Sequence, residues 1–374
     1  MEKFSLLKRC YPAVLCAGLL AGCQTVEQFS IDYMLPAKVS FPASLKRVGV
    51  VNNMPPIPDN QLIVDRPPRE EGEFARRTNY YNGDGKITTE ALADALADGN
   101  YFDQVVICDS ALRAGDVIQR ESILSAEEVD RLVSQLEVDF LIALENIQMR
   151  TIRRINYVEG LDAYDATLDV KVYPLVRVYV PRRSASMTAI LSTDSIFWDA
   201  TGLTMESANA RLISDKQMIT EASHFAGSVP VKDLLPHWKR GDRYYFAGGS
   251  VNMRDAAVYV RKGQWSDAVA LWKKEYDTRK HPKQKMQAAY NLAFGYEMQD
   301  SITTAFRWID QAQQLAYRVD DVEAKRQDGG TVEEWAVPDY AETVRYYLEL
   351  KERNDGLMRL NVQMQRIKDE DDNL

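Results

Sequence analysis

The fold of the first half of the chain is decided by residues 125–147, which read SAEEVDRLVSQLEVDFLIALENI. The stretch opens with a capping box, in which Ser125 and Glu128 are spaced to bond each other's backbone N–H groups. Between residues 129 and 136 the apolar positions recur at i, i+3, i+4 and i+7, which predicts an amphipathic helix. Residues 138–147 then continue without a break as an apolar run typical of a buried strand.

The same kinds of element precede this stretch. Residues 46–51 and 102–108 are short runs rich in β-branched residues, and both are predicted strands. Between them, residues 89–98 predict a helix with Thr88 as its cap. The resulting order of strand, helix, strand, helix, strand favours an α/β layer structure.

Two longer strands are predicted after it, at residues 166–180 and 187–198, joined by a turn at 181–184. The first of them alternates apolar and polar residues, as expected when one face of a strand meets water. A short turn between two strands makes them antiparallel. We therefore predict an α/β domain with a mixed sheet over residues 45–240.

Residues 20–23, LAGC, end an apolar run of ten residues that follows a basic segment. That run is too short to cross a bilayer core, which needs roughly 20 residues, and it has the order of a signal peptide. LAGC resembles the lipobox of bacterial lipoproteins. The resemblance implies a signal peptide at 1–22 and a mature chain that begins with Cys23 carrying a diacylglycerol and an N-acyl chain. The alternative is an ordinary secretory signal, with Cys23 a plain thiol.

The chain has a formal net charge of −9, and residues 1–22 carry more basic than acidic residues, so the mature chain is more acidic still. Nucleic acids and anionic membranes are bound mainly through Lys and Arg, so neither is an expected partner. Once Cys23 is lipidated and the signal peptide is gone, Cys108 is the remaining cysteine. No disulfide within the chain and no Cys/His metal cluster is therefore predicted.

Two proline-containing segments lie on either side of the first predicted strand. Residues 23–44 include Pro36 and Pro42 and are predicted to be a tether without regular structure. Residues 54–71 contain five prolines and predict a long extended loop, whose role the sequence leaves open.

Residues 82–88, NGDGKIT, resemble the middle of a calcium-binding EF-hand loop. Such a loop needs an oxygen ligand at its first position and a bidentate carboxylate at its twelfth. Tyr80 and Ala91 occupy those positions, so we predict a glycine-rich turn and no metal or other cofactor apart from the acyl chains.

Four acidic residues crowd the segment 159–169, namely Glu159, Asp162, Asp165 and Asp169. Paired carboxylates can act as general acid and base. Their spacing is irregular, however, and favours a solvated acidic loop over a catalytic pair. We find no other catalytic constellation, so the chain is expected not to be an enzyme, with a hydrolase using this loop as the alternative.

Residues 241–368 show helical periodicity and an internal repeat with an offset of 37 residues. Ala256, Tyr259, Gly263, Ala268 and Trp272 correspond to Ala293, Tyr296, Asp300, Ala305 and Ile309. Small residues at helix crossings, with large residues beside them, resemble the tetratricopeptide repeat. The resemblance implies an all-α, repeat-like domain, capped by a helix at residues 340–364 and followed by an acidic tail at 369–374.

In such repeats the first helix of each pair lines a concave face. In the second copy this would expose Gln287, Tyr290, Phe294 and Glu297, which we take as candidate residues for gripping a partner peptide. The alternative is that these side chains pack against the α/β domain or the C-terminal helix.

The order of lipobox, α/β domain and repeat helices resembles a family of uncharacterised lipoproteins from Bacteroidota. The sequences that carry this resemblance are GQWSDAVALW at 263–272 and AYNLA at 289–293. The α/β domain loosely resembles the N-terminal domain of TolB and the CsgG- and LpoB-type envelope lipoproteins. Neither resemblance implies a reaction.

These observations together predict an envelope lipoprotein that binds another envelope protein or peptide as a non-enzymatic adaptor, through its helices, its α/β domain or both. The alternatives are the hydrolase and, by resemblance to CsgG, a subunit of a secretion pore. Gln24 after the lipidated cysteine resembles outer-membrane sorting. The expected location is thus the periplasmic leaflet of the outer membrane, with the cell surface as the alternative.

Overall fold

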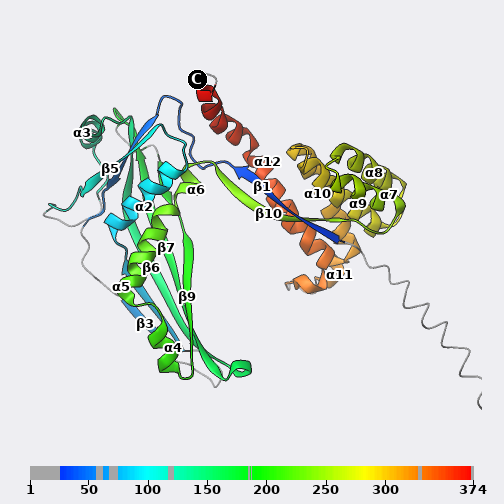
Figure 1. Cartoon of the computed structure of the whole chain (residues 1–374), viewed down its shortest axis with the longest axis horizontal. Helices are drawn as coiled ribbons and strands as arrows, with labels where there is room; N and C mark the ends of the chain where they lie inside the picture. Colours follow the sequence, from blue (N-terminus) through cyan, green and yellow to red (C-terminus); the bar gives the residue numbers. More distant parts are fainter. Residues whose placement is uncertain are drawn as a thin grey trace, which may run out of the picture. The chain divides into compact units, whose positions relative to one another are not determined.

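The computed structural model describes residues 26–55, 62–66, 75–116, 122–183, 186, 188–326 and 331–371 (Figure 1). The chain folds into two compact units. The α/β unit takes residues 36–237 and the chain from residue 359 onward. The helical unit takes the chain up to residue 35 together with residues 238–358. Among the described residues, no helix is both long enough and apolar enough to cross a bilayer.

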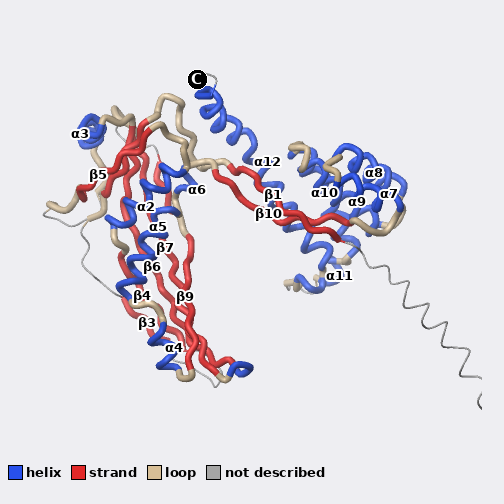
Figure 2. Tube along the Cα trace, in the orientation of Figure 1, coloured by secondary structure: helices blue, strands red, loops and turns tan. Residues whose placement is uncertain are grey.

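An eight-stranded mixed sheet is the centre of the α/β unit, within the part of the chain that the structure describes (Figure 2). Its strands are β2 (Arg47–Asn52), β3 (Leu62–Arg66), β4 (Ala75–Asn82), β5 (Gln104–Ala111), β6 (Phe140–Val158), β7 (Ala163–Tyr179), β8 (Thr188–Leu191) and β9 (Asp194–Gly202). The mixed sheet that the sequence predicts is thereby confirmed.

Strand β2 lies between β5 and β6 and runs parallel to both. The other pairs are antiparallel, and the longest is β6 with β7. Along one side of β6, residues 140–144 pair with β2 and residues 148–155 pair with β4. The sheet therefore has a parallel end around β2 and an antiparallel end beyond it.

Five helices accompany this sheet within the described residues. They are α2 (Gly85–Asp98), α3 (Ala126–Leu136), α4 (Met205–Arg211), α5 (Asp215–Ser228) and α6 (Val231–Leu234). Figure 1 shows α2, α5 and α4 along one side of the long strands. Helix α5 approaches α2 closely at Gly227, where a Cβ atom would lie 2.6 Å from the Thr88 carbonyl oxygen.

The two faces of the sheet are buried by different residues. On the side of α2 and α5, the core includes Val48, Val50, Ile142 and Leu168. On the side of α3, a smaller cluster contains Val51, Leu141 and Ala143 with the apolar stripe of that helix. Adjacent strand residues alternate between the two clusters, as a period of two requires, so the parallel end of the sheet is covered on both faces.

The prediction of an unstructured tether at 23–44 is wrong for the part that the structure describes. Residues 26–35 form strand β1 (Val26–Leu35), and Tyr33, Leu35, Ala37, Val39 and Phe41 are all buried. The prolines do not prevent this, because the chain stays extended and one residue in two meets a core.

The structure corrects three other expectations in the α/β unit. The helix predicted at 89–98 begins at Gly85, because the Asp84 carboxylate accepts the N–H groups of Lys86 and Ile87. The strand predicted at 187–198 is divided between β8 and β9. The acidic segment at 159–169 is a short 3-10 turn, Glu159–Leu161, followed by the start of β7.

The helical unit contains two strands and six helices within its described residues. They are β1, β10 (His237–Phe246), α7 (Val251–Arg261), α8 (Trp265–Thr278), α9 (Pro282–Glu297), α10 (Ile302–Val319), α11 (Val322–Lys325) and α12 (Pro338–Asp371), the last of which continues into the α/β unit. β1 and β10 pair with each other as a two-stranded ribbon (Figure 2).

The repeat pattern corresponds to two consecutive helix pairs, α7 with α8 and α9 with α10. The four alanines predicted at helix crossings, Ala256, Ala268, Ala293 and Ala305, are fully buried. Helix α9 also approaches α8 closely at Gly295, where a Cβ atom would lie 2.5 Å from Val269 Cγ2. The predicted all-α region is thus confirmed from α7 onward, whereas residues 241–246, also predicted to be helical, belong to strand β10. The resemblance to the tetratricopeptide repeat stays a prediction.

The C-terminal helix is longer than predicted and does not belong wholly to the helical unit. Beyond residue 358 it is part of the α/β unit, where Gln363 bonds the backbone of Ala37 and Val39. Arg366 lies over the ring of Tyr101 at 4.9 Å. The helix extends to Asp371, so the first half of the predicted acidic tail is helical.

Candidate functional site

The lipidation site predicted at Cys23 lies outside the described residues, as do residues 1–22, Gln24 and most of the proline-rich segment 54–71. The lipobox interpretation therefore rests on the sequence.

The prediction that four side chains of α9 form an exposed binding face is wrong. Gln287, Tyr290, Phe294 and Glu297 retain between 0 and 8% of their exposure. The ribbon and α12 pack against the face of α9 that was expected to be open. The alternative, that these side chains pack on the C-terminal helix, is thus correct in part. Other contacts that bury them come from the ribbon of β1 and β10.

Glu297 is the centre of a buried ion cluster. Its carboxylate accepts two hydrogen bonds from Arg243 of β10, at 2.9 and 3.0 Å, and others from Tyr346 and Arg353 of α12. The side chains of Arg243 and Glu297 are 2% and 1% exposed. Burial alone would lower the pKa of Arg243, but the hydrogen bond and charge of Glu297 outweigh it and raise that pKa. Glu297 therefore joins the ribbon to α9 and α12 and is not free to bind a partner.

A groove remains open on the helical unit, between the ribbon and the first turns of α12. We name it the ribbon groove; its volume is about 590 Å³. Its lining residues are Val26, Gln28, Phe29, Ser30, Asp242, Arg243, Tyr244, Phe246, Tyr290, Pro338, Asp339, Glu342, Arg345, Tyr346 and Glu349. Of the predicted binding residues, Tyr290 is the one that reaches this groove.

One wall of the ribbon groove is aromatic. Tyr244 stacks on Tyr290 with ring centroids 4.6 Å apart, and Phe246 meets Tyr290 edge to face at 5.7 Å. Tyr346 adds a fourth ring, 5.1 Å from Tyr290. Burial raises the pKa of Tyr244 to about 12 and that of Tyr290 well above its usual value, so these phenols stay neutral over the physiological range.

The rim of the same groove is acidic. Asp242, Asp339, Glu342 and Glu349 line it, against the two cations Arg243 and Arg345. Glu349 accepts a 2.7 Å hydrogen bond from Arg243, and Glu342 accepts one of 2.6 Å from Arg345. The Glu342 side chain is 43% exposed, so this carboxylate also faces solvent. Rings beside carboxylates form a surface suited to a cation.

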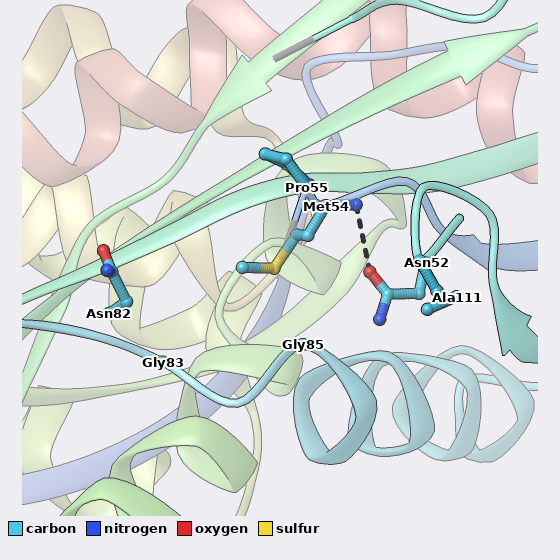
Figure 3. A pocket seen from close by; sticks show the side chains of 8 residues that line it. Asn52, Met54, Pro55, Asn82, Gly83, Gly85 and Ala111 are labelled. Carbon is cyan, nitrogen blue, oxygen red and sulfur yellow. Dashed lines mark hydrogen bonds between the residues drawn. The ribbon is translucent and has the colours of Figure 1, made fainter. Parts of the chain in front are cut away.

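A smaller pocket lies in the α/β unit, at the carboxyl end of β2 (Figure 3). Its volume is about 200 Å³, and it lies between β2 and the first turn of α2. Asn52 accepts a hydrogen bond from the Met54 N–H at 3.0 Å. Its amide nitrogen lies against Gly85, where a Cβ atom would come within 2.9 Å of it. Open α/β sheets commonly bind ligands at this edge, but Asp84 already accepts two N–H groups of the first turn of α2.

A buried network of polar side chains lies beside this pocket, at the ends of β2 and β6. Glu145 accepts hydrogen bonds from Asn53 Nδ2 at 2.8 Å and from the Tyr179 hydroxyl at 2.7 Å. Arg113 donates to Asn53 Oδ1 at 2.8 Å and to Glu128 at 2.9 Å. Burial raises the pKa of Glu145 in spite of these donors. Each of these side chains has a partner, so the network holds the ends of β2 and β6 and offers no free group.

The acidic residues at 159–169 are not brought together. Asp162 accepts the Tyr157 hydroxyl at 2.6 Å near the turn, and Asp169 pairs with Arg154 at 2.9 Å within the sheet. Asp165 lies opposite Asn156 on β6. Within the described part of the chain, no group of three or more His, Cys, Asp or Glu residues could hold a metal ion.

Sequence patterns do not identify the residues of the ribbon groove. Residues 243–246, RYYF, mark only the border of the helical region in the sequence, and β1 falls within the predicted tether. A signal for β1 is nevertheless present, because residues 29–41 carry apolar side chains at odd positions. That alternation indicates a strand.

Comparison with known protein families gives two matches. A model described as a domain of unknown function, DUF8603, matches residues 45–246, which is more than half of the chain. A second, described as a domain of unknown function, DUF6340, matches residues 254–352. The first covers most of the α/β unit and β10, and the second covers most of the helices that follow. The comparisons with curated proteins and with solved structures gave no significant match.

Proposed function

We propose that this chain, which belongs to the DUF8603 family of domains of unknown function, is a membrane-anchored adaptor of the cell envelope. In this proposal it binds a basic segment of a partner protein in the ribbon groove. The observation that carries the proposal is the aromatic wall of the groove facing an acidic rim. The adaptor performs no chemical step of its own.

The groove favours a lysine or arginine side chain on physical grounds. A cation within about 6 Å of an aromatic ring gains about 0.5–2 kcal/mol, more when water is excluded. The half-buried Tyr244, stacked on Tyr290, lines the groove, and Glu342 offers a carboxylate to the same charge. An acidic segment would add like charge beside the rim carboxylates Asp242, Asp339, Glu342 and Glu349.

The size of the groove favours a short segment of a partner. Its volume of about 590 Å³ lies within the roughly 300–1,000 Å³ typical of sites for small ligands. A few side chains fill such a space, so we propose that the partner inserts an extended peptide while its folded body stays outside.

The anchor in this proposal is the acylated Cys23. Each buried methylene of an acyl chain contributes about 0.8 kcal/mol, and two or more chains give stable attachment. The proposed location is the periplasmic leaflet of the outer membrane, with the cell surface as the alternative. The adaptor would then hold its partner at the membrane.

The adaptor is preferred to the hydrolase because the acidic segment 159–169 has no convergent pair. Asp162 and Asp169 each bond a different neighbour. The pore subunit stays a separate hypothesis, because an aromatic groove with an acidic rim is no evidence for or against assembly into a pore.

The proposal is tested by photocrosslinking from inside the groove. A photoreactive phenylalanine analogue replaces Gln28, an uncharged residue of the groove, in one strain. In a second strain it replaces Lys351 of α12, which does not line the groove. We expect one discrete envelope protein to be captured from position 28 and not from 351. Equal capture from both positions, or none from 28, would contradict the proposal.

A charge reversal tests the chemistry of the same groove. Calorimetric titration of the purified protein with a lysine-containing peptide should give binding that the matched glutamate peptide lacks. Glu342→Lys should weaken that binding at least tenfold. Glu352→Lys makes the same charge change on α12 at a residue that does not line the groove, so it should have little effect. The idea fails if both variants behave alike.

A further inference from the structure

The ribbon groove is bordered by an ion cluster that belongs to the chain itself. Arg345 of α12 donates a hydrogen bond through Nη1 to Glu342 at 2.6 Å and another through Nη2 to Glu334 at 2.8 Å. Glu334 begins a short 3-10 helix, Glu334–Ala336, that precedes α12. The two carboxylates thus hold one guanidinium between them, and we name Glu334 and Glu342 the carboxylate clamp.

The carboxylate clamp lies beside the aromatic wall of the groove. Glu342 and Arg345 both line the groove. Burial is the main cause of the raised pKa of Tyr244, and the negative charge of Glu342 raises that pKa further, whereas the positive charge of Arg345 lowers it. Both charges are therefore close enough to act on the Tyr244 hydroxyl, so a cation held by Glu342 is a neighbour of the aromatic wall.

Arg345 is a cation that an incoming charge can displace. Its side chain is 57% exposed, and those of Glu334 and Glu342 are 75% and 43% exposed. Ion pairs at such exposure contribute little to stability. Arg243 also lines the groove, but its side chain is 2% exposed and is held by Glu297 inside the buried ion cluster. An incoming cation can therefore replace Arg345 at the clamp, whereas Arg243 is fixed.

We propose that Arg345 occupies the place of the partner's cation in the unbound protein, and that this cation is the side chain of an arginine. The inference rests on the function proposed above and names the residue by which the partner segment is held. When the partner binds, its guanidinium takes over the two carboxylates of the clamp, and Arg345 turns outward into solvent. The contacts of Arg345 thus show which chemical group the clamp accepts.

An arginine fits this place better than a lysine for two reasons. A guanidinium is planar and presents its two Nη groups to separate acceptors, as Arg345 does, whereas an ammonium is a compact point charge. A guanidinium is also more weakly hydrated and stacks on aromatic rings, so it loses less hydration on leaving water beside Tyr244. The groove therefore accepts a lysine with lower affinity than an arginine.

The test compares two peptides that differ in one residue, acetyl-Gly-Leu-Arg-Leu-Gly amide and its lysine counterpart. Each is titrated by calorimetry into the full-length protein in detergent. We expect the arginine peptide to bind at least threefold more tightly than the lysine peptide. Equal binding of the two peptides would overturn the inference and leave the adaptor function standing. Binding of neither peptide would overturn both.

Arg345→Gln tests the displacement. The substitution removes the competing cation, so the arginine peptide should bind at least threefold more tightly than it binds the wild type. Arg307→Gln makes the same change of net charge at an exposed residue of α10 that does not line the groove, and it should leave the affinity unchanged. Unchanged or weaker binding in Arg345→Gln, or an equal gain in both variants, would refute the displacement.

Glu334→Gln tests the carboxylate of the clamp that is not among the lining residues of the groove. With one of the two acceptors neutralised, the arginine and lysine peptides should bind alike. Glu333→Gln, at the exposed neighbouring residue, is the matched control and should keep the preference for arginine. A preference retained in Glu334→Gln would refute the clamp. The comparison of the two peptides uses the unaltered chain, so it decides the matter even if a variant does not fold.

Discussion

Two buried glutamates of this protein have different partners. Glu297 meets the guanidinium groups of Arg243 and Arg353, so its charge is compensated inside the helical unit. Glu145 meets an amide and a phenol at hydrogen-bond distance. A buried charge without an opposite charge beside it favours its neutral form. The stability of the α/β unit should therefore depend on the protonation of Glu145.

Glu145→Gln should flatten the pH dependence of unfolding. Because burial raises the pKa of Glu145 above its usual value of 4.5, the folded chain keeps a proton that the unfolded chain loses as the pH rises past 4.5. The stabilisation from this group is thus complete below 4.5 and is lost as the pH rises through the folded pKa. Urea denaturation between about pH 4 and pH 8 should show this fall in the wild type and a smaller one in the variant.

Glu127→Gln, on the solvent side of α3, is the control for that experiment and should keep the wild-type slope. Coincident slopes for the wild type and Glu145→Gln would show that burial of this carboxyl has no effect on stability.

At the scale of elements, the helical unit depends on close contacts between helices. α9 carries Gly295 in its interior, where glycine costs about 1 kcal/mol relative to alanine in helix propensity alone. The contact with α8 explains it, since a Cβ atom there would lie 2.5 Å from Val269 and 2.9 Å from Trp272. Trp272 is fully buried and has no room to move.

Gly295→Ala should therefore destabilise the helical unit, although alanine is the better helix former. Overpacking of a tight core costs about 1–3 kcal/mol, which outweighs the gain in propensity. The measurement is the free energy of unfolding followed by tryptophan fluorescence, since Trp272 is in the affected contact. Gly160→Ala, where no atom lies within 4 Å of the new Cβ, should be neutral. A stabilising Gly295→Ala would show that α8 and α9 are free to separate.

At the scale of the whole molecule, the proposed lipid anchor would determine where this acidic protein is found. With a net charge of −9, the chain has little electrostatic attraction to anionic lipids. In the proposed function, attachment to the membrane comes from acyl chains on Cys23. The ribbon groove would act only where that anchor holds it.

Cys23→Ser should release the protein from the membrane fraction. In the wild type, carbonate washing should leave the protein in the pellet, and metabolic labelling with a palmitate analogue should mark it. Both properties should be absent from the variant and retained by Cys108→Ser, whose thiol is part of the α/β unit. An unlabelled wild-type protein that washes off with carbonate would rule out the lipid anchor.

The sequence by itself was sufficient for the class of each unit. The strands around residues 46–51 and 138–147, the capped helix between residues 125 and 136, and the buried alanines of the repeat are all visible as local patterns. They are predictable because a period of two or 3.6 residues reports which side of an element meets a core. The LAGC pattern at residues 20–23, which resembles a lipobox, is likewise a local signal.

Only the tertiary structure decided which faces are covered. β1 pairs with β10, more than two hundred residues later, and this pairing places the ribbon over the face of α9 that a repeat pattern leaves open. Arg243 and Glu297 meet across that contact. Periodicity tells that a face is apolar but not which distant segment buries it, because burial is decided by contacts between residues far apart in the chain. For the same reason the ribbon groove could be located only in the folded molecule.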